Sequence, residues 1–219
     1  MVRVLSFDVG IRHLAFVDVA STADGVYTIH RWDVLDVTQG EGISKKKGAF
    51  DVLSRQLLTA LDANFNDPDI VYDVVLIENQ PANKNPMMKS VQMTIYTYFN
   101  CLSMFVGNVG TLKLVAASRK TTCMAHMPPP PPVDEKTTRA PESDSAKYRE
   151  RKLESIRIAS HYLEHVIQDA ASLAVLRLSK KKDDLCDCLL QALWYLESTG
   201  LRAASTTSRA TSAQPPSSL

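Results

Sequence analysis

The chain has 219 residues, of which 45% are hydrophobic, enough to bury one sizeable core in a single α/β-type domain. Its 25 Lys and Arg nearly balance its 24 Asp and Glu, for a formal net charge of +1, so bulk charge points to no particular partner. No apolar run reaches transmembrane length, which argues against a membrane protein, and the four cysteines form no CxxC pair, which favours a reduced, intracellular protein over a secreted one.

The expected location follows from the N-terminus. The first residues enter a strand-like segment at once, which leaves no room for a signal or transit peptide. We therefore expect the protein, which could be cellular or viral, to act in the cytoplasm or nucleus. The mitochondrion is the less favoured location.

The first part of the chain predicts mainly strands. Three of them are expected, over residues 2–8, 13–20 and 26–35. Asp24-Gly25 has the composition of the turn between the second and the third. Apolar residues at helical spacing then predict a helix over 49–64, and VYDVVLI predicts another buried strand over 71–77.

The second part predicts mainly helices. They are expected over 87–107, 148–170 and 183–198, with a strand over 111–116 after the first of them. The 87–107 helix has a stripe of Val91, Ile95, Tyr98, Leu102 and Phe105 and further apolar bulk outside it, so it is expected to be buried against the sheet and against a second subunit.

Two segments differ from the rest in composition. Residues 126–146 contain five consecutive prolines and predict a mobile or polyproline-type insertion, more simply a spacer than a signalling ligand. Residues 201–219 are rich in Ser, Thr, Ala and Pro and predict a disordered tail. One domain over 1–200 is therefore expected.

Two carboxylates end apolar strands. Asp8 follows the first strand, and Glu78 follows VVLI of the fourth. Removing an unpaired charge from water costs several kcal/mol, so each must be paired, protonated or bound to a cation, unless it simply faces solvent. Two such acids on core strands of one sheet favour a shared purpose.

The stretch KKKDDLCD supplies more acids. On a helix that begins near Asp183, the side chains of Asp183, Asp184 and Asp187 share one face, away from the apolar face. Capping and the helix dipole account for Asp183 and Asp184, but not for Asp187 one turn further in. If this helix packs on the sheet, its acids can meet Asp8 and Glu78.

Converging carboxylates repel one another unless cations lie among them. Magnesium or manganese prefers all-oxygen ligands, and two such ions roughly 4 Å apart promote in-line attack of water on a phosphodiester. Basic clusters would then contact phosphates, although each alone could be a solvated face. The clusters are Lys45–Lys47, Lys84 with Lys89, Arg149 with Arg151 and Lys152, and Lys180–Lys182.

Three segments together resemble a known family. LSFDVGIRHLAF, LIENQPANKNPMMKSVQMTIYTYF and KKKDDLCDCLLQAL are similar, in order and spacing, to the RuvC-type Holliday junction resolvases of mitochondria and large, poxvirus-like DNA viruses, over about residues 2–196. The resemblance implies an α/β ribonuclease-H-like fold, a central mixed sheet flanked by helices. It also implies a homodimer that binds four-way DNA junctions and resolves them by paired symmetric nicks, with two Mg²⁺ or Mn²⁺ ions per site.

The resemblance assigns roles to particular residues. The catalytic residues would be Asp8, Glu78, Lys120, Asp184 and Asp187, and the metal ligands the same four acids, with Asp183 as the alternative to Asp184. Lys120 would orient the attacking water or bind the scissile phosphate, its plain alternative being an exposed loop lysine. The residues expected to contact DNA are Asn83, Lys84, Lys89, Arg119, Lys180, Lys181 and Lys182.

Rival interpretations remain. Another nuclease of the same fold, acting on RNA–DNA hybrids or branched replication intermediates, is the main alternative, and a junction-binding protein without cleavage activity is a second. FDVGIRHLAF also resembles the first phosphate loop of actin-like kinases, but no second such loop follows. His161-Tyr-Leu-Glu164-His165 matches the HxxEH pattern of zinc peptidases, yet its histidines are expected to point away from the apolar stripe of their helix.

Overall fold

The computed structural model describes residues 1–38, 49–83, 85–122 and 143–199. Lys45–Lys47, Lys84, most of the expected insertion and the expected tail lie outside the described residues. Within these ranges one mixed sheet has the strand order β3-β2-β1-β4-β5. Its strands are β1 (Val2–Asp8), β2 (His13–Ser21), β3 (Tyr27–Asp36), β4 (Tyr72–Glu78) and β5 (Val109–Val115).

The strand directions position the site. The β1–β2 and β2–β3 pairs are antiparallel, whereas β1–β4 and β4–β5 are parallel. Because β1, β4 and β5 run the same way, their carboxyl ends meet at one edge of the sheet. The continuous apolar runs of β1 and β4 reflect burial on both faces, as expected for the centre of such a sheet.

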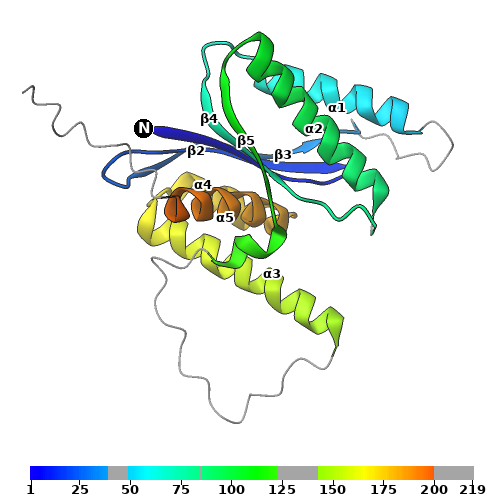
Figure 1. The fold of residues 1–219 in the computed structure, drawn as a ribbon. Coiled ribbons are helices and arrows are strands. Elements are labelled where there is room, and N and C mark those ends of the chain that lie inside the picture. The colour runs from blue at the N-terminus through cyan, green and yellow to red at the C-terminus, as the bar shows by residue number, and fades with distance from the viewer. Residues whose placement is uncertain (39–48, 84, 123–142, 200–219) are drawn as a thin grey trace, which may run out of the picture.

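Helices cover both faces of the sheet. Figure 1 shows α1 (Ala49–Phe65) and α2 (Pro86–Phe105) on one face. On the other face lie α3 (Asp144–His161), α4 (Ala170–Leu178) and α5 (Lys182–Ser198). Phe7 of β1 packs on Phe65 and Phe99 of the first layer, with ring centroids 5.3 Å away in both cases. The chain therefore has three layers, with a core on each side of the sheet.

Two hydrogen bonds fix the start and middle of α5 on the sheet. Gln191 Nε2 donates to Ser6 Oγ at 3.0 Å, and both side chains are fully buried. Trp32 Nε1 of β3 donates to the Leu185 carbonyl oxygen at 3.0 Å. Since buried polar groups are costly without partners, these bonds specify how α5 lies across β1 and β3.

One glycine is required by a close approach near the site. A Cβ atom on Gly10 would lie 1.9 Å from the carbonyl oxygen of His13, so no other residue fits there without a shift of the backbone. Gly10 therefore permits the tight connection from β1 into β2, directly after Asp8.

The predicted strands and first two helices are found, but the helix expected over 148–170 is wrong in extent. The α-helix α3 begins at Asp144, inside the expected insertion, and ends at His161, where a π-helical turn (Tyr162–Val166) follows. Gln168 has a φ of 57°, and Asp169 then caps α4 by accepting from the Ser172 amide at 3.0 Å. The α4 helix was not predicted.

The buried face of α2 also differs from expectation. Phe99 is fully buried, whereas Phe105 is 80% exposed, so the stripe from Val91 to Leu102 ends before Phe105. The α5 helix begins at Lys182, and Lys181 occupies its N-cap without a side-chain hydrogen bond, so Asp183 does not cap it. Among the helices that the structure describes, none is both long and apolar enough to span a lipid bilayer.

Candidate active site

The two strand-end acids meet at the edge shared by the parallel strands. Asp8 ends β1 and Glu78 ends β4, and the residues before them, Phe7 and Ile77, are in register. Their side chains are 15% and 13% exposed, so both carboxylates are largely removed from water. Such a pair requires a compensating positive charge.

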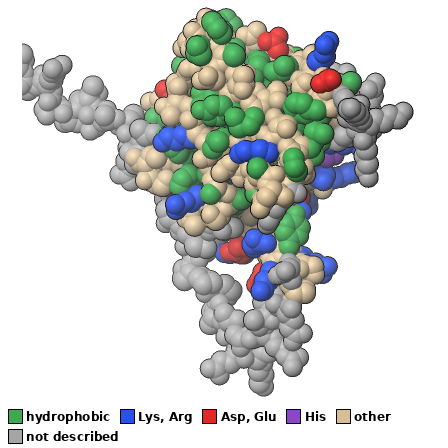
Figure 2. Space-filling model, turned by 45° about the vertical axis from the view of Figure 1, so that its right-hand side comes forward, with side chains coloured by type: hydrophobic (Ala, Val, Ile, Leu, Met, Phe, Trp, Pro, Cys, Tyr) green, Lys and Arg blue, Asp and Glu red, His purple; other side chains and the backbone are tan. Residues whose placement is uncertain are grey.

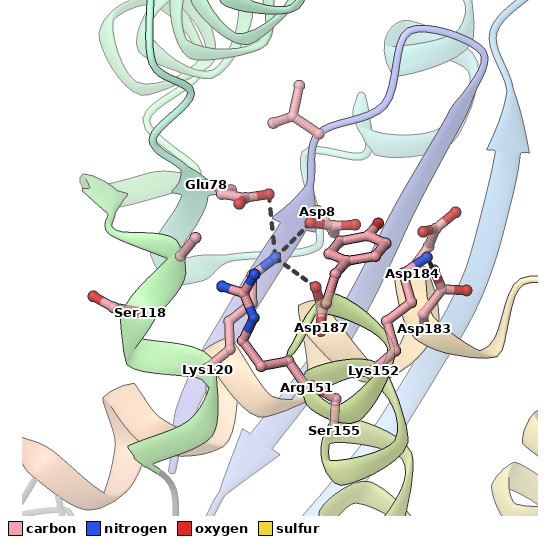
Figure 3. A pocket seen from close by; sticks show the side chains of 13 residues that line it. Asp8, Glu78, Ser118, Lys120, Arg151, Lys152, Ser155, Asp183, Asp184 and Asp187 are labelled. Atoms are coloured by element: carbon pink, nitrogen blue, oxygen red, sulfur yellow. Dashed lines mark hydrogen bonds and ion pairs between the residues drawn. The ribbon is translucent and has the colours of Figure 1, made fainter. Parts of the chain in front are cut away.

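Lys120 supplies that charge. It lies in a short 3-10 helix, Ala117–Thr122, that follows β5 at the same edge of the sheet. Its Nζ atom is 2.6 Å from Asp8 Oδ1, 3.1 Å from Glu78 Oε2 and 3.0 Å from Asp187 Oδ2 (Figure 3). The Lys120 side chain is 5% exposed, so it is not the exposed loop lysine of the alternative interpretation.

The environment shifts the ionisation of this cluster. Burial alone would lower the pKa of Lys120, but the charges of Asp8, Asp187 and Glu78 raise it well above its usual range. Burial raises the pKa of Asp8 to about 7, and the neighbouring Glu78 adds to the increase. Burial also raises the pKa of Asp187. Lys120 therefore remains an ammonium at neutral pH, while burial disfavours the charged forms of Asp8 and Asp187.

The adjacent acids at the start of α5 have different partners. Asp183 accepts a hydrogen bond from Lys152 of α3. Burial would raise the pKa of Asp183, but this bond lowers it. Burial raises the pKa of Asp184 to about 6, and the negative charges of Asp183 and Asp8 contribute to the increase. The nearest ammonium to Asp184 among the described residues is Lys181, at the longer distance of 3.9 Å.

These side chains line one pocket of about 400 Å³. One wall consists of acids from β1, β4 and α5, and the 3-10 helix contributes Lys120 and Ser118. The opposite wall comes from α3, whose contributing residues are Tyr148, Arg151, Lys152 and Ser155. The pocket thus combines carboxylates with cations, as an ion-assisted phosphate site requires.

The carboxylate oxygens fit a hard divalent cation in chemistry and in charge. In the described part of the chain, no three His, Cys, Asp or Glu side chains are arranged to hold a metal ion as they stand. The ammonium of Lys120 lies among the oxygens of Asp8, Glu78 and Asp187, so this cluster already holds a cation. The ligands here are carboxylate oxygens, and Mg²⁺ and Mn²⁺ prefer oxygen ligands.

The residues expected to contact DNA do not form one cluster, in contrast to the acids. Lys89 donates from Nζ to Asn79 Oδ1 and to Gln92 Oε1, each at 3.0 Å, and so orders the segment after Glu78. Arg119 is exposed and lies over the Trp194 ring at 5.5 Å. Asn83, Lys180 and Lys181 are exposed, and Lys182 is half-buried.

One part of the sequence interpretation needs correction. The Lys180–Lys182 cluster, expected to contact DNA, is not directed at DNA alone, because Lys181 Nζ lies 3.9 Å from Asp184 Oδ2. The α3 wall was not predicted, because Arg149, Arg151 and Lys152 stood out in the sequence only as a basic cluster. A signal was available, since Tyr148, Lys152 and Ser155 follow helical spacing and so share one face of α3.

The HxxEH segment does not form a metal site in the described residues. Its Glu164 is 2.8 Å from the guanidinium of Arg177, and His165 is exposed. The ring of His161, the last residue of α3, lies 4.7 Å from the ring of His165 in the π-helical turn. Glu164 is therefore engaged by a cation rather than positioned as a catalytic base.

The fold can be compared with solved structures. The yeast mitochondrial Holliday junction resolvase Ydc2 superimposes with a TM-score of 0.56 and 18% identity, over 89% of this chain and 79% of that one. The fowlpox virus resolvase, solved with its substrate Holliday junction DNA, gives 0.52 and 18%, over 90% and 98%. This chain has a ribonuclease-H-like fold. The ribonuclease-H-like fold expected from the sequence is thereby confirmed.

Sequence comparison adds one relative of unassigned role. An uncharacterised protein of Acanthamoeba polyphaga mimivirus, L451, is 31% identical over 131 residues. The match covers 56% of this chain but only 28% of the mimivirus protein, so this chain spans about a quarter of the curated relative that it matches. No family model matches the chain.

Proposed function

We propose that the protein is a metal-dependent endonuclease that resolves four-way DNA junctions by paired symmetric nicks. One observation carries the proposal: Asp8, Glu78 and Asp187 converge on one buried ammonium where parallel strands end. The ribonuclease-H-like fold, shared with a yeast and a fowlpox resolvase, supports the substrate class. A DNA substrate is consistent with the cytoplasmic or nuclear location expected from the sequence.

The proposed ligands of two Mg²⁺ or Mn²⁺ ions are Asp8, Glu78, Asp184 and Asp187. Of the adjacent pair we favour Asp184, because the Asp183 carboxylate is already engaged by Lys152. When bound, the ions supply Lewis-acid stabilisation of the charge that develops on the phosphate and on the leaving oxygen.

Lys120 contributes as a cation and a hydrogen-bond donor. Since its carboxylate partners hold its pKa above the usual range, it does not act as a general base near neutral pH. Its ammonium lies at the pocket that Asp8 and Glu78 line, and a non-bridging phosphate oxygen there can accept a hydrogen bond in place of one of the three carboxylates. A substrate phosphate would thus be held and neutralised beside the acids.

Paired incision requires two sites, and an apolar face is available for a homodimer. Met93, Met104 and Phe105 of α2 are 42%, 69% and 80% exposed. Figure 2 shows hydrophobic side chains gathered on one side of the molecule, where α1, α2 and β5 lie in Figure 1. We propose that this surface, the α2 face, packs against a second copy, because exposed contiguous apolar patches commonly mark protein interfaces.

The proposed activity is tested with a mobile four-way junction and Mg²⁺, beside linear duplex, flap and RNA–DNA hybrid substrates. Paired symmetric nicks at the junction are expected. The Asp8→Asn variant should bind the junction but not cut it, because it removes a charged ligand and leaves the surface unchanged. The exposed Asp69→Asn is the matched control and should cut normally. Faster cutting of the hybrid than of the junction would overturn the proposal.

A further inference from the structure

The α3 wall of the pocket presents two groups that the proposed chemistry leaves unused. Tyr148, Arg151, Lys152 and Ser155 recur at the spacing of one helix face and line the pocket opposite Glu78. Figure 3 shows the side chains of Arg151 and Lys152 rising from α3 toward the carboxylates. The Ser155 hydroxyl favours the ionised form of Asp187 by hydrogen bonding. Tyr148 contacts Lys152 of the same helix, and neither Tyr148 nor Arg151 has a task in the proposed chemistry.

Arg151 and Lys152 are neighbours with different roles. The Lys152 ammonium is engaged by Asp183. Arg151 is exposed and makes no ion pair or hydrogen bond with any residue that the structure describes. A guanidinium offers five N–H donors in a planar fork that matches phosphate oxygens. Arg151 is therefore the cation of this wall that is available to an incoming anion.

Tyr148 adds an aromatic surface at the same place. Its side chain is 55% exposed, and the Lys152 ammonium lies 4.7 Å from its ring centroid. This contact helps to hold the ring beside the pocket, since a cation is attracted to the face of an aromatic ring. An exposed ring flanked by cations is the combination that binds single-stranded nucleic acid, by base stacking and phosphate contact.

We infer that α3 binds the strand to be cut, with Arg151 on a backbone phosphate and Tyr148 stacked on the base of an adjacent, unpaired nucleotide. The inference rests on the proposed function and deepens it, because it names the feature of the substrate that is recognised. In a linear duplex both faces of each base are covered by neighbours, whereas bases at a branch point can leave the stack at lower cost. Tyr148 thus favours branched over linear DNA.

The test separates the two contacts by different readouts. Binding is measured with a four-way junction that carries 2-aminopurine at the branch point, and Ca²⁺ replaces Mg²⁺ in the buffer. Ca²⁺ also binds oxygen ligands but prefers a different coordination geometry. For Tyr148→Ala we expect junction affinity to fall roughly 5- to 150-fold, which is the range of base–aromatic stacking. The change in 2-aminopurine fluorescence on binding should be lost, whereas the salt dependence of the affinity should not change. Tyr148→Phe should behave as wild type.

Arg151→Gln should show the complementary pattern. The slope of log affinity against log salt should decrease by about 0.7 to 0.9, the effect of losing one phosphate contact, while the 2-aminopurine signal persists. The control is Arg157→Gln on the same helix, because the Arg157 guanidinium pairs with Glu154 at 2.6 Å. This control should leave both readouts unchanged.

Each outcome has a defined meaning. If Tyr148→Ala keeps the affinity and fluorescence signal of the wild type, or if Tyr148→Phe loses as much as Tyr148→Ala, stacking by Tyr148 is overturned. An unchanged salt slope in Arg151→Gln overturns the phosphate contact. If the wild type binds the junction no more tightly than linear duplex, the proposed function fails together with the inference. Thermal unfolding of each variant verifies that the fold is intact.

Discussion

The Nζ atom of Lys120 lies 2.6 Å from Oδ1 of Asp8, although 112 positions separate the two residues in the chain. The contact joins the end of β1 to the 3-10 helix after β5, and the same ammonium reaches Glu78 between them. One cation thus ties together the carboxyl ends of three parallel strands. Any ion that binds these carboxylates must share their oxygens with Lys120 or displace it.

Replacing Lys120 by Met should therefore affect stability in a metal-dependent way. Breaking a buried ion pair from one side costs about 3–5 kcal/mol, because the remaining charges are left without compensation. We expect the free energy of unfolding of metal-free Lys120→Met to fall by that order in urea titrations. Millimolar Mg²⁺ should then stabilise the variant more than the wild type, since it supplies the missing positive charge.

The control for Lys120→Met is Lys113→Met on β5. Lys113 is exposed and lies over the Tyr195 ring at 4.8 Å, away from the acids. Its loss should change stability by less than about 1 kcal/mol, with no special response to Mg²⁺. Equal stability of Lys120→Met and wild type without metal would contradict the role assigned to the ammonium.

The raised pKa of Asp8 predicts the pH dependence of stability in the metal-free protein. Its pKa is about 7 in the folded state against an ordinary value of 3.8, so between these pH values the folded state holds more protons on Asp8 than the unfolded state does. The free energy of unfolding should therefore fall as pH rises from about 4 to about 7, and level off above. Asp184, with a pKa of about 6, adds a decrease of the same sign.

Comparison with Asp8→Asn isolates this effect from the other acids. Chemical denaturation at several pH values gives the difference in unfolding free energy between wild type and variant. The unfolding free energy of the wild type minus that of the variant should decrease as pH rises from about 4 to about 7, because only the wild type carries the titrating group. A difference that stays constant or increases with pH would show that burial does not control the ionisation of Asp8.

The adjacent acids Asp183 and Asp184 should differ in their effect on cleavage. Asp184→Asn is expected to reduce junction cutting to near background, as for a lost metal ligand. Asp183→Asn is expected to cost only about 10- to 100-fold, the range of residues that act through a neighbour, because it releases Lys152. Single-turnover rates in Mg²⁺ and Mn²⁺ give the comparison. A greater loss in Asp183→Asn would reverse the assignment.

The dimer proposed for the α2 face predicts a change of oligomeric state. Phe105→Glu places a charge at the most exposed aromatic side chain of that face and should shift a dimer to monomers in light scattering. Paired nicks should give way to single, uncoupled nicks. The control Leu178→Glu changes a side chain that is 85% exposed on α4 and should remain dimeric. A monomeric wild type at micromolar concentration would rule out this interface.

Much of the scaffold could be predicted from the sequence because its signals are local. Strands buried on both faces produce continuous apolar runs, and an acid at the end of such a run stands out, as Asp8 and Glu78 do. The burial of Lys120 leaves no such trace. Its partners are 67 and 112 positions away, so only the resemblance to a family drew attention to it.

The errors have identifiable physical causes. The interruption before α4 occurs at Gln168, whose positive φ is unusual for a residue that is neither Gly nor Asn, so nothing in its type predicts the break. Phe105 fits the apolar stripe of α2 by spacing, but the helix ends at Phe105 and leaves this ring exposed. Periodicity reports which residues share a face and not how far the neighbouring layer extends.

The hydrogen bond from Trp32 to the Leu185 carbonyl oxygen has a practical consequence. It places an indole, only 8% exposed, against the residue that directly follows Asp184. Indole emission depends on the polarity and hydrogen bonding around the ring, and the chain has only two tryptophans. A displacement of the first turn of α5 would therefore alter the emission of Trp32. The protein carries an intrinsic optical probe beside its acidic cluster, which can follow the arrival of ions or DNA without a label.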